Sequence, residues 1–188
     1  MNGAALSADG RRRWLILDRD GVINHDSAAY IRGPDEWHPI AGALDAIARL
    51  HRAGFGLAVA TNQSGVGRGY FDLPTLDAIH ARMHAAIAAA GGRLDALAYC
   101  PHAPEANCAC RKPRPGLLHR LMAECGFEAN EAIMIGDAGR DLEAARAAGM
   151  GALAVGGQAD ALAHAFGVAG FANLAAAADW LLEGHWPC

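Results

Sequence analysis

The sequence predicts an α/β fold with a doubly wound parallel sheet. Short apolar runs recur along the chain, and segments of helical composition separate them. Four of these runs end directly in acidic, hydroxyl, amide or basic residues. This arrangement is expected where the carboxyl ends of parallel strands meet at one edge of a sheet. With 188 residues and 53% hydrophobic content, the chain is long enough for one well-buried domain.

The domain organisation follows from where polar and apolar segments fall. We expect residues 1–10 to form a disordered lead-in and residues 11–188 to form a single domain. Between the first and second expected strands there is room for about one loop and one helix. The sequence therefore predicts no large cap domain, and an active site shielded only by its loops.

The first expected strand ends in a pair of aspartates, in the run LILDRDGVIN at residues 15–24. Residues i and i+2 of a strand point the same way, so Asp18 and Asp20 can converge. A cation such as Mg²⁺ would offset their repulsion, one carboxylate could attack phosphorus, and the other could act as acid and base. The alternative is a solvated turn after a buried strand, because short motifs often match by chance.

The second expected strand, residues 55–60, leads into a glycine-containing loop. This loop can present hydroxyl, amide and backbone N–H donors to an anion. The alternative is a flexible turn. The residues that offer these side chains are Thr61, Asn62, Gln63 and Ser64.

A basic loop and a second acidic segment follow. In RKPRPG, residues 111–116, Arg111 and Lys112 lie in a proline-extended stretch before an expected helix, which suits a phosphate group. The apolar run 132–135 ends near Asp137, which is placed to be a metal ligand. Asp141 remains open between a partner of the metal, a partner of Lys112 and an exposed helix residue.

Three cysteines and a histidine lie in an eleven-residue window, at Cys100, His102, Cys108 and Cys110. They predict a Cys₃His zinc site with a structural role, because four protein ligands leave no position for a substrate. Reduced free cysteines or a disulfide are the alternatives, and nothing in the sequence points to an oxidising compartment. Such a site would anchor the loop that precedes Arg111.

The four motifs, in this order, resemble those of the haloacid dehalogenase (HAD) superfamily of phosphohydrolases. The resemblance implies a HAD-like, Rossmannoid fold in which Asp18 is the nucleophile. It implies that Asp20 is the general acid and base and also offers its backbone carbonyl to Mg²⁺, with Asp137 as a further ligand. Thr61 and Lys112 would stabilise the transferring phosphoryl group.

Within that superfamily, DRDGVIN, TNQSGVGRGYF and CPH with CxCRKP resemble the D-glycero-D-manno-heptose 1,7-bisphosphate 7-phosphatase family. This family supplies nucleotide-activated heptose for lipopolysaccharide. Histidinol-phosphate phosphatase is the nearest alternative, and the RGYF element favours the sugar phosphatase. The implied substrate contacts are Asp26, Tyr30, Thr61, Asn62, Gln63, Ser64, Arg68, Arg111 and Lys112.

Two departures from the family pattern stand out. The family commonly has a lysine directly after the aspartate of the fourth motif, whereas this chain has Ala138. One expected substrate contact is therefore missing. The zinc loop is also short, with five residues between His102 and Cys108.

Charge and composition narrow the function classes. The net charge of -4 and the pI near 6.1 argue against a nucleic-acid or anionic-membrane protein. The amino-terminal segment is neither a signal peptide nor a membrane span. We therefore expect a cytoplasmic protein. Together with the motifs and the family resemblance, this predicts a monomer that uses Mg²⁺ and structural Zn²⁺ and acts on a small phosphorylated sugar. A zinc-stabilised sugar-phosphate binding module and a HAD phosphatase for histidinol phosphate or a nucleic-acid 3′ phosphate remain alternatives.

The remaining segments predict structure rather than chemistry. Residues 73–90 and 115–125 have helical composition, and His80 and His84 fall on one solvated helical face. After a strand pattern at 151–157, residues 158–183 predict one or two helices. Trp180 and Trp186 are interpreted as packing residues.

Overall fold

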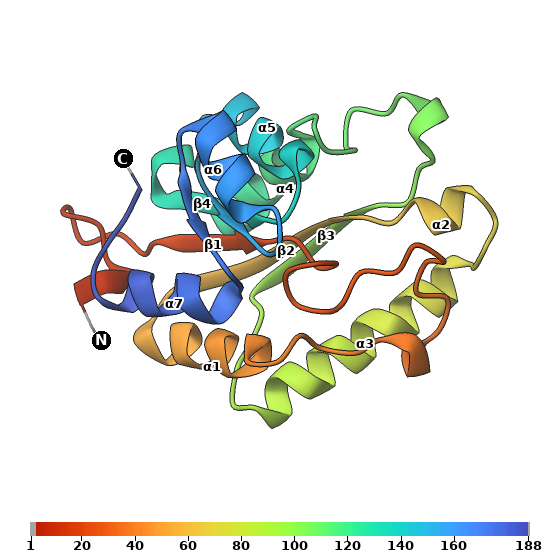
Figure 1. The fold of residues 1–188 in the computed structure, drawn as a ribbon, viewed down its shortest axis with the longest axis horizontal. Helices are drawn as coiled ribbons and strands as arrows, with labels where there is room; N and C mark the ends of the chain where they lie inside the picture. The colour runs from red at the N-terminus through yellow and green to blue at the C-terminus, as the bar shows by residue number, and fades with distance from the viewer. Residues whose placement is uncertain (1–2, 188) are drawn as a thin grey trace.

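The computed structural model describes residues 3–187, which form a six-stranded parallel sheet with helices on both faces (Figure 1). The strand order is β3-β2-β1-β4-β5-β6, and all five neighbouring pairs are parallel. The strands are β1 (Trp14–Leu17), β2 (Gly56–Asn62), β3 (Ala96–Cys100), β4 (Ala132–Gly136), β5 (Gly151–Val155) and β6 (Ala169–Phe171).

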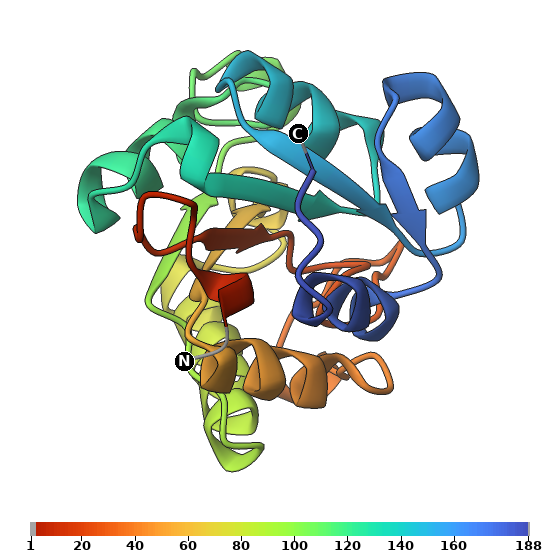
Figure 2. The same ribbon diagram turned by 90° about the vertical axis from the view of Figure 1, so that its left-hand side faces the viewer.

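Helices cover both faces of the sheet (Figures 1 and 2). On one face lie α1 (Ala43–Ala53), α3 (Leu73–Ala89) and α7 (Leu174–Leu182), and on the other α4 (Gly116–Cys125), α5 (Gly139–Ala147) and α6 (Ala159–Phe166). The short helical turns are α2 (Ser64–Gly67), η1 (Gly3–Ala5), η2 (Pro34–Glu36), η3 (Pro104–Ala106) and η4 (Ala129–Glu131). No helix among residues 3–187 is long and apolar enough to cross a membrane.

The central strand β1 is buried on both faces. Leu15 and Leu17 pack into the core shared with α1, α3 and α7, whereas Trp14 and Ile16 pack into the core shared with α4, α5 and α6. This alternation follows from the two-residue period of a strand. It explains why the central strands are continuous apolar runs rather than alternating ones.

The strand order determines where the segments that carry the predicted site residues lie. Chain connections run outward in opposite directions from β1, through β2 and β3 on one side and through β4, β5 and β6 on the other. In such sheets the ligand crevice lies beyond the carboxyl ends of the strands at this reversal. Asp18 directly follows β1 and Asp137 directly follows β4, so both lie at this point.

The predicted α/β fold without a large cap is confirmed, and β1, β2, β4 and β5 lie where the sequence predicts strands. The sixth strand, β6, lies in the tail that was predicted as helices only. It has three half-buried residues and pairs with β5 alone, so it carries no long apolar pattern. Thr61 and Asn62 extend β2 rather than opening a loop, and α2 forms a turn of helix where a loop was expected.

Residues 3–10 differ from the disordered lead-in that the sequence predicts, while residues 1–2 lie outside the described residues. Ala5 is 1% exposed, its carbonyl accepts a hydrogen bond from the Arg13 backbone N–H at 2.9 Å, and Leu6 forms a bridge with Arg12. This small apolar side chain completes the core at the start of β1, which holds the segment in place.

The prediction of a solvated face for both histidines of α3 is wrong for His80. Its side chain is buried and lies 5.5 Å from the ring of Tyr99, whereas His84 is exposed. Burial, followed by the positive charge of Arg19, lowers the pKa of His80 to about 3. His80 is therefore neutral in the folded protein at neutral pH.

This buried histidine predicts a pH dependence of stability. Unfolded His80 takes up a proton below its ordinary pKa of about 6.5, whereas the folded form does not until about pH 3. The free energy of unfolding is therefore unaffected by His80 above about pH 6.5. On acidification to pH 5 it falls by about 2 kcal/mol because of this residue. In His80→Gln, urea unfolding should show a smaller loss between pH 7 and pH 5 than in the parent. An equal loss in both proteins, with His84→Gln as control, would contradict this assignment.

Candidate active site

Three carboxylates meet beyond the ends of β1 and β4. Asp18, Asp137 and Asp141 each offer an oxygen, and these oxygens lie within 4.8 Å of one another. Gly21 permits this approach, because it has φ of 81° and a side chain there would overlap the Asp137 carboxylate. The donor set is all oxygen, which suits a hard cation such as Mg²⁺.

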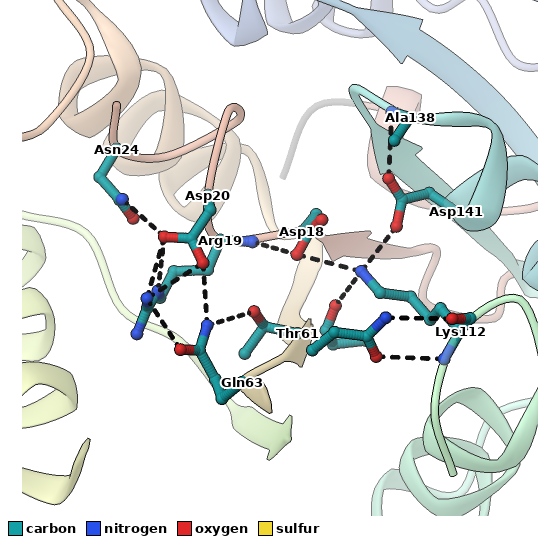
Figure 3. Close-up of polar contacts among 11 residues, drawn as sticks. Asp18, Arg19, Asp20, Asn24, Thr61, Gln63, Lys112, Ala138 and Asp141 are labelled. Carbon is teal, nitrogen blue, oxygen red and sulfur yellow. Dashed lines mark hydrogen bonds and ion pairs between the residues drawn. The ribbon is translucent and has the colours of Figure 1, made fainter. Parts of the chain in front are cut away.

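The ammonium group of Lys112 lies between two of these carboxylates (Figure 3). Its Nζ is 3.0 Å from Asp18 Oδ1 and 2.6 Å from Asp141 Oδ1, and it donates to the Ala60 carbonyl at 2.7 Å. Its three N–H donors therefore all have partners. Asp141 is fully buried and also accepts a hydrogen bond from the Ala138 N–H, so it is a partner of Lys112 and not an exposed helix residue.

The electrostatics of this cluster favour a cation. Burial, opposed by Lys112 and supported by Asp141, raises the pKa of Asp18 to about 7. Burial and then Asp141 raise the pKa of Asp137 to about 6. Burial alone would lower the pKa of Lys112, but its two carboxylate neighbours raise it, so Lys112 is charged. Lys112 pairs with two of the three carboxylates, and a divalent cation would stabilise the ionised forms of all three.

Asp20 points away from this cluster and into a cradle of donors (Figure 3). Its carboxylate accepts hydrogen bonds from Arg19 at 2.9–3.1 Å, from Asn24 at 2.8 Å and from Gln63 Nε2 at 2.8 Å. Gln63 Nε2 also donates to Thr61 Oγ1 at 2.9 Å, which leaves the Thr61 hydroxyl hydrogen free to donate elsewhere. To act as an acid and base, Asp20 must therefore break hydrogen bonds with these donors and turn its carboxylate toward the substrate.

A pocket of about 280 Å³ opens beside these groups. Arg140, at the first turn of α5, and the buried Arg19 also line it, and the sequence motifs predict a role for neither of them. A signal for Arg140 was present, since it lies three residues after Asp137 at a predicted strand end. The predicted site residues that line the pocket are Asp18, Asp20, Asp26, Tyr30, Asn62, Gln63, Ser64 and Arg111.

Other predicted substrate contacts lie outside this pocket lining. Thr61 and Lys112 are buried, 1% and 2% exposed, beside it. Arg68 follows α2 and pairs with Glu105 of η3 at 3.5 Å, so its role as a substrate contact stays a prediction. Asn62, which does line the pocket, has a second role. Its side-chain amide accepts a hydrogen bond from the Lys112 N–H at 3.1 Å and donates one to the Lys112 carbonyl at 3.0 Å.

Tyr30 forms a wall of the pocket with an unusual backbone. It has φ of 65°, which is rare for a residue with a large side chain. Its ring lies 4.9 Å from that of Tyr70, and the Arg32 guanidinium lies 5.0 Å from the same Tyr70 ring. The edge-to-face contact of the two rings and the cation–π contact of Arg32 support the strained turn beside the pocket.

The predicted zinc ligands converge in the loop between β3 and α4. Cys110 Sγ lies 3.2 Å from Cys100 Sγ, 3.4 Å from Cys108 Sγ and 3.3 Å from His102 Nδ1. A tetrahedron with zinc bonds of about 2.0–2.3 Å has edges of about 3.3–3.8 Å. The four residues therefore fit a structural zinc ion.

The thiols of this cluster hold protons unequally. Burial raises the pKa of Cys100 to about 12. Burial acts to raise the pKa of Cys108, but hydrogen bonds with Cys110 and Cys100 outweigh this effect and lower the pKa to about 6. A bound divalent cation would favour the thiolate form of all three cysteines.

Comparisons with known proteins agree with this geometry. The sequence model of the haloacid dehalogenase-like hydrolase family matches residues 3–149. The chain belongs to this family. It is 53% identical over 137 residues to the D-glycero-beta-D-manno-heptose-1,7-bisphosphate 7-phosphatase of Pseudomonas putida, covering 73% of this chain and 78% of that protein. The enzyme of the same name from Neisseria meningitidis serogroup B is 46% identical, with 73% of each chain covered.

Solved structures extend the likeness to the fold. The D,D-heptose 1,7-bisphosphate phosphatase of Bordetella bronchiseptica, solved with magnesium and phosphate, has a TM-score of 0.85 and 43% identity over 92% of this chain and 99% of that chain. The Burkholderia thailandensis phosphatase has a TM-score of 0.65 and 39% identity, over 90% and 99% of the two chains. Both resemblances that the motifs predict, to the HAD superfamily and to the heptose bisphosphate phosphatases, are confirmed.

Removing the charge of Asp18 should separate activity from stability. Asp18→Asn keeps the side-chain volume and an acceptor for Lys112, and it removes a carboxylate whose burial is unfavourable. We expect phosphatase activity to fall at least about a thousandfold and the thermal midpoint to stay within about 3 °C or rise. Asp45→Asn, at an exposed site on α1, is the control. Activity within tenfold of the parent would contradict the nucleophile role.

Removing one thiol should show whether the cysteine cluster holds zinc. Cys108→Ala should lower the zinc content of the purified protein and its thermal midpoint by about 5 °C or more, because loss of the metal frees the loop. Cys125→Ala removes a half-buried thiol outside the cluster and should keep the zinc. Unchanged metal content and midpoint in Cys108→Ala would rule out a zinc ligand at this position.

Proposed function

We propose that this chain is a Mg²⁺-dependent phosphatase that removes the 7-phosphate of D-glycero-D-manno-heptose 1,7-bisphosphate through an aspartyl-phosphate intermediate. The observation that carries the proposal is the buried Asp18–Lys112–Asp141 arrangement beside Asp137 at the strand-order reversal. The relatives described above bear this activity in their names. The product would supply nucleotide-activated heptose for lipopolysaccharide.

The nucleophilic step falls to Asp18. One of its carboxylate oxygens forms a bond to the phosphorus of the 7-phosphate as the bond to the sugar oxygen breaks. Negative charge on the phosphoryl oxygens is met by Lys112 and by the free hydroxyl hydrogen of Thr61. Asp18, Asp137 and the Asp20 backbone carbonyl would hold Mg²⁺, which supplies further positive charge at the phosphoryl group.

Proton transfer falls to Asp20. Its side chain turns from the Arg19 and Gln63 cradle, gives a proton to the departing sugar oxygen, and then takes one from the water that cleaves the aspartyl phosphate. Asn24 and Gln63 hold the Asp20 carboxylate in the cradle, so their hydrogen bonds must break before it can turn toward the substrate.

The cysteine cluster would hold the loop that leads into this site. It lies immediately before Arg111 and Lys112 in the chain, and four protein ligands leave no open position for a substrate. A zinc ion there would act structurally, by holding the loop from which Lys112 enters the core.

The test is phosphate release from both anomers of heptose 1,7-bisphosphate, with histidinol phosphate as a comparison substrate. Since the Pseudomonas and Neisseria relatives are named for the β anomer, we expect this anomer to be hydrolysed with the highest kcat/KM. Chelation should abolish turnover, and added Mg²⁺ should restore it. Preference for histidinol phosphate would move the function to another HAD phosphatase, and metal-independent turnover would contradict the mechanism.

A further inference from the structure

Three arginine side chains line the pocket, and two of them, Arg111 and Arg140, come from elements other than the nucleophile loop. Arg111 lies in the loop before α4, and Arg140 lies in the first turn of α5. Among residues 3–187, neither forms an ion pair with a carboxylate. Arg111 makes one long hydrogen bond, at 3.4 Å to the His102 carbonyl.

The other cations at the site already have partners. Lys112 pairs with Asp18 and Asp141 beneath the pocket, and Arg19 pairs with Asp20. Both are buried, whereas Arg140 is exposed. The pocket therefore has paired, buried cations beside the nucleophile and unpaired guanidinium groups nearer to solvent.

We propose that Arg140 is a specificity-determining residue that binds the second, non-transferred phosphate of a bisphosphate substrate. This inference rests on the proposed function, because it takes Asp18 as the point at which the other phosphate reacts.

Charge balance supports the inference. Each phosphate monoester carries about -1.5 to -2 charges at neutral pH, so a bisphosphate brings about three to four negative charges. The cations near Asp18 serve the reacting group, and the second phosphate needs cations of its own farther out. Arginine suits this task, since its planar fork can give two parallel hydrogen bonds to phosphate oxygens.

The surroundings of Arg140 keep it charged. The side chain is solvent-exposed but partly desolvated by its neighbours, which alone would lower the pKa of the guanidinium, and the carboxylates of Asp141 and Asp18 raise it. Ala138, two residues earlier, brings no charge to this turn. Arg140 is thus the cation that α5 contributes to the pocket lining within the described part of the chain.

The test compares matched substrates that differ by one phosphate. We measure kcat/KM for heptose 1,7-bisphosphate and heptose 7-phosphate in the parent, Arg140→Ala, Arg140→Lys and the control Arg120→Ala, which lies on α4 away from the pocket. Arg140→Ala should reduce the preference for the bisphosphate by about ten- to a hundredfold, mainly through KM. Arg140→Lys should restore part of this preference, and Arg120→Ala should leave it unchanged.

Fructose 1,6-bisphosphate and fructose 6-phosphate provide a second pair that does not depend on the heptose assignment. Failure of the parent on both heptose substrates would refute the proposed function, while the fructose pair still tests Arg140. The inference is overturned if Arg140→Ala lowers kcat/KM equally for the two members of a pair. It is also overturned if the parent shows no preference for either bisphosphate.

Discussion

The ion pairs of the buried Lys112 are the interaction on which the site depends. Its ammonium joins three parts of the chain that are distant in sequence: Asp18 after β1, the Ala60 carbonyl in β2, and Asp141 on α5. Desolvation makes such a buried network costly, and a hydrophobic replacement would often be at least as stable. We interpret its presence as functional, because it holds a charged nucleophile and a cation together at the strand-order reversal.

The segment that carries Lys112 is held on two sides. On one side the cluster of Cys100, His102, Cys108 and Cys110 gathers the preceding loop into a geometry that suits zinc. On the other side the Asn62 side chain bonds both backbone groups of Lys112. A residue outside regular secondary structure is thereby held by specific contacts, and a fixed position is what stabilisation of a transferring phosphoryl group requires.

Much of this architecture could be predicted from the sequence, because the central strands are buried on both faces and read as apolar runs that end in polar residues. β6 was missed since an edge strand of three half-buried residues has no such run. The burial of His80 and the pairing of Asp141 with Lys112 depend on which elements pack together, and helical spacing does not reveal this. Motif resemblance predicts Arg68 as a substrate contact, whereas its ion pair with Glu105 depends on the path of the chain after α2 and has no signal in the sequence.

The central claim is that Asp18 becomes covalently phosphorylated, and trapping that intermediate tests it most directly. The parent protein would be mixed with Mg²⁺ and heptose 1,7-bisphosphate, quenched within one turnover and treated with borohydride, which reduces an acyl phosphate to an alcohol. The account predicts that mass spectrometry finds this reduction at Asp18, only when substrate is present and at a level that follows the turnover rate. Turnover with an unmodified Asp18, or with the modification on another residue, would contradict it.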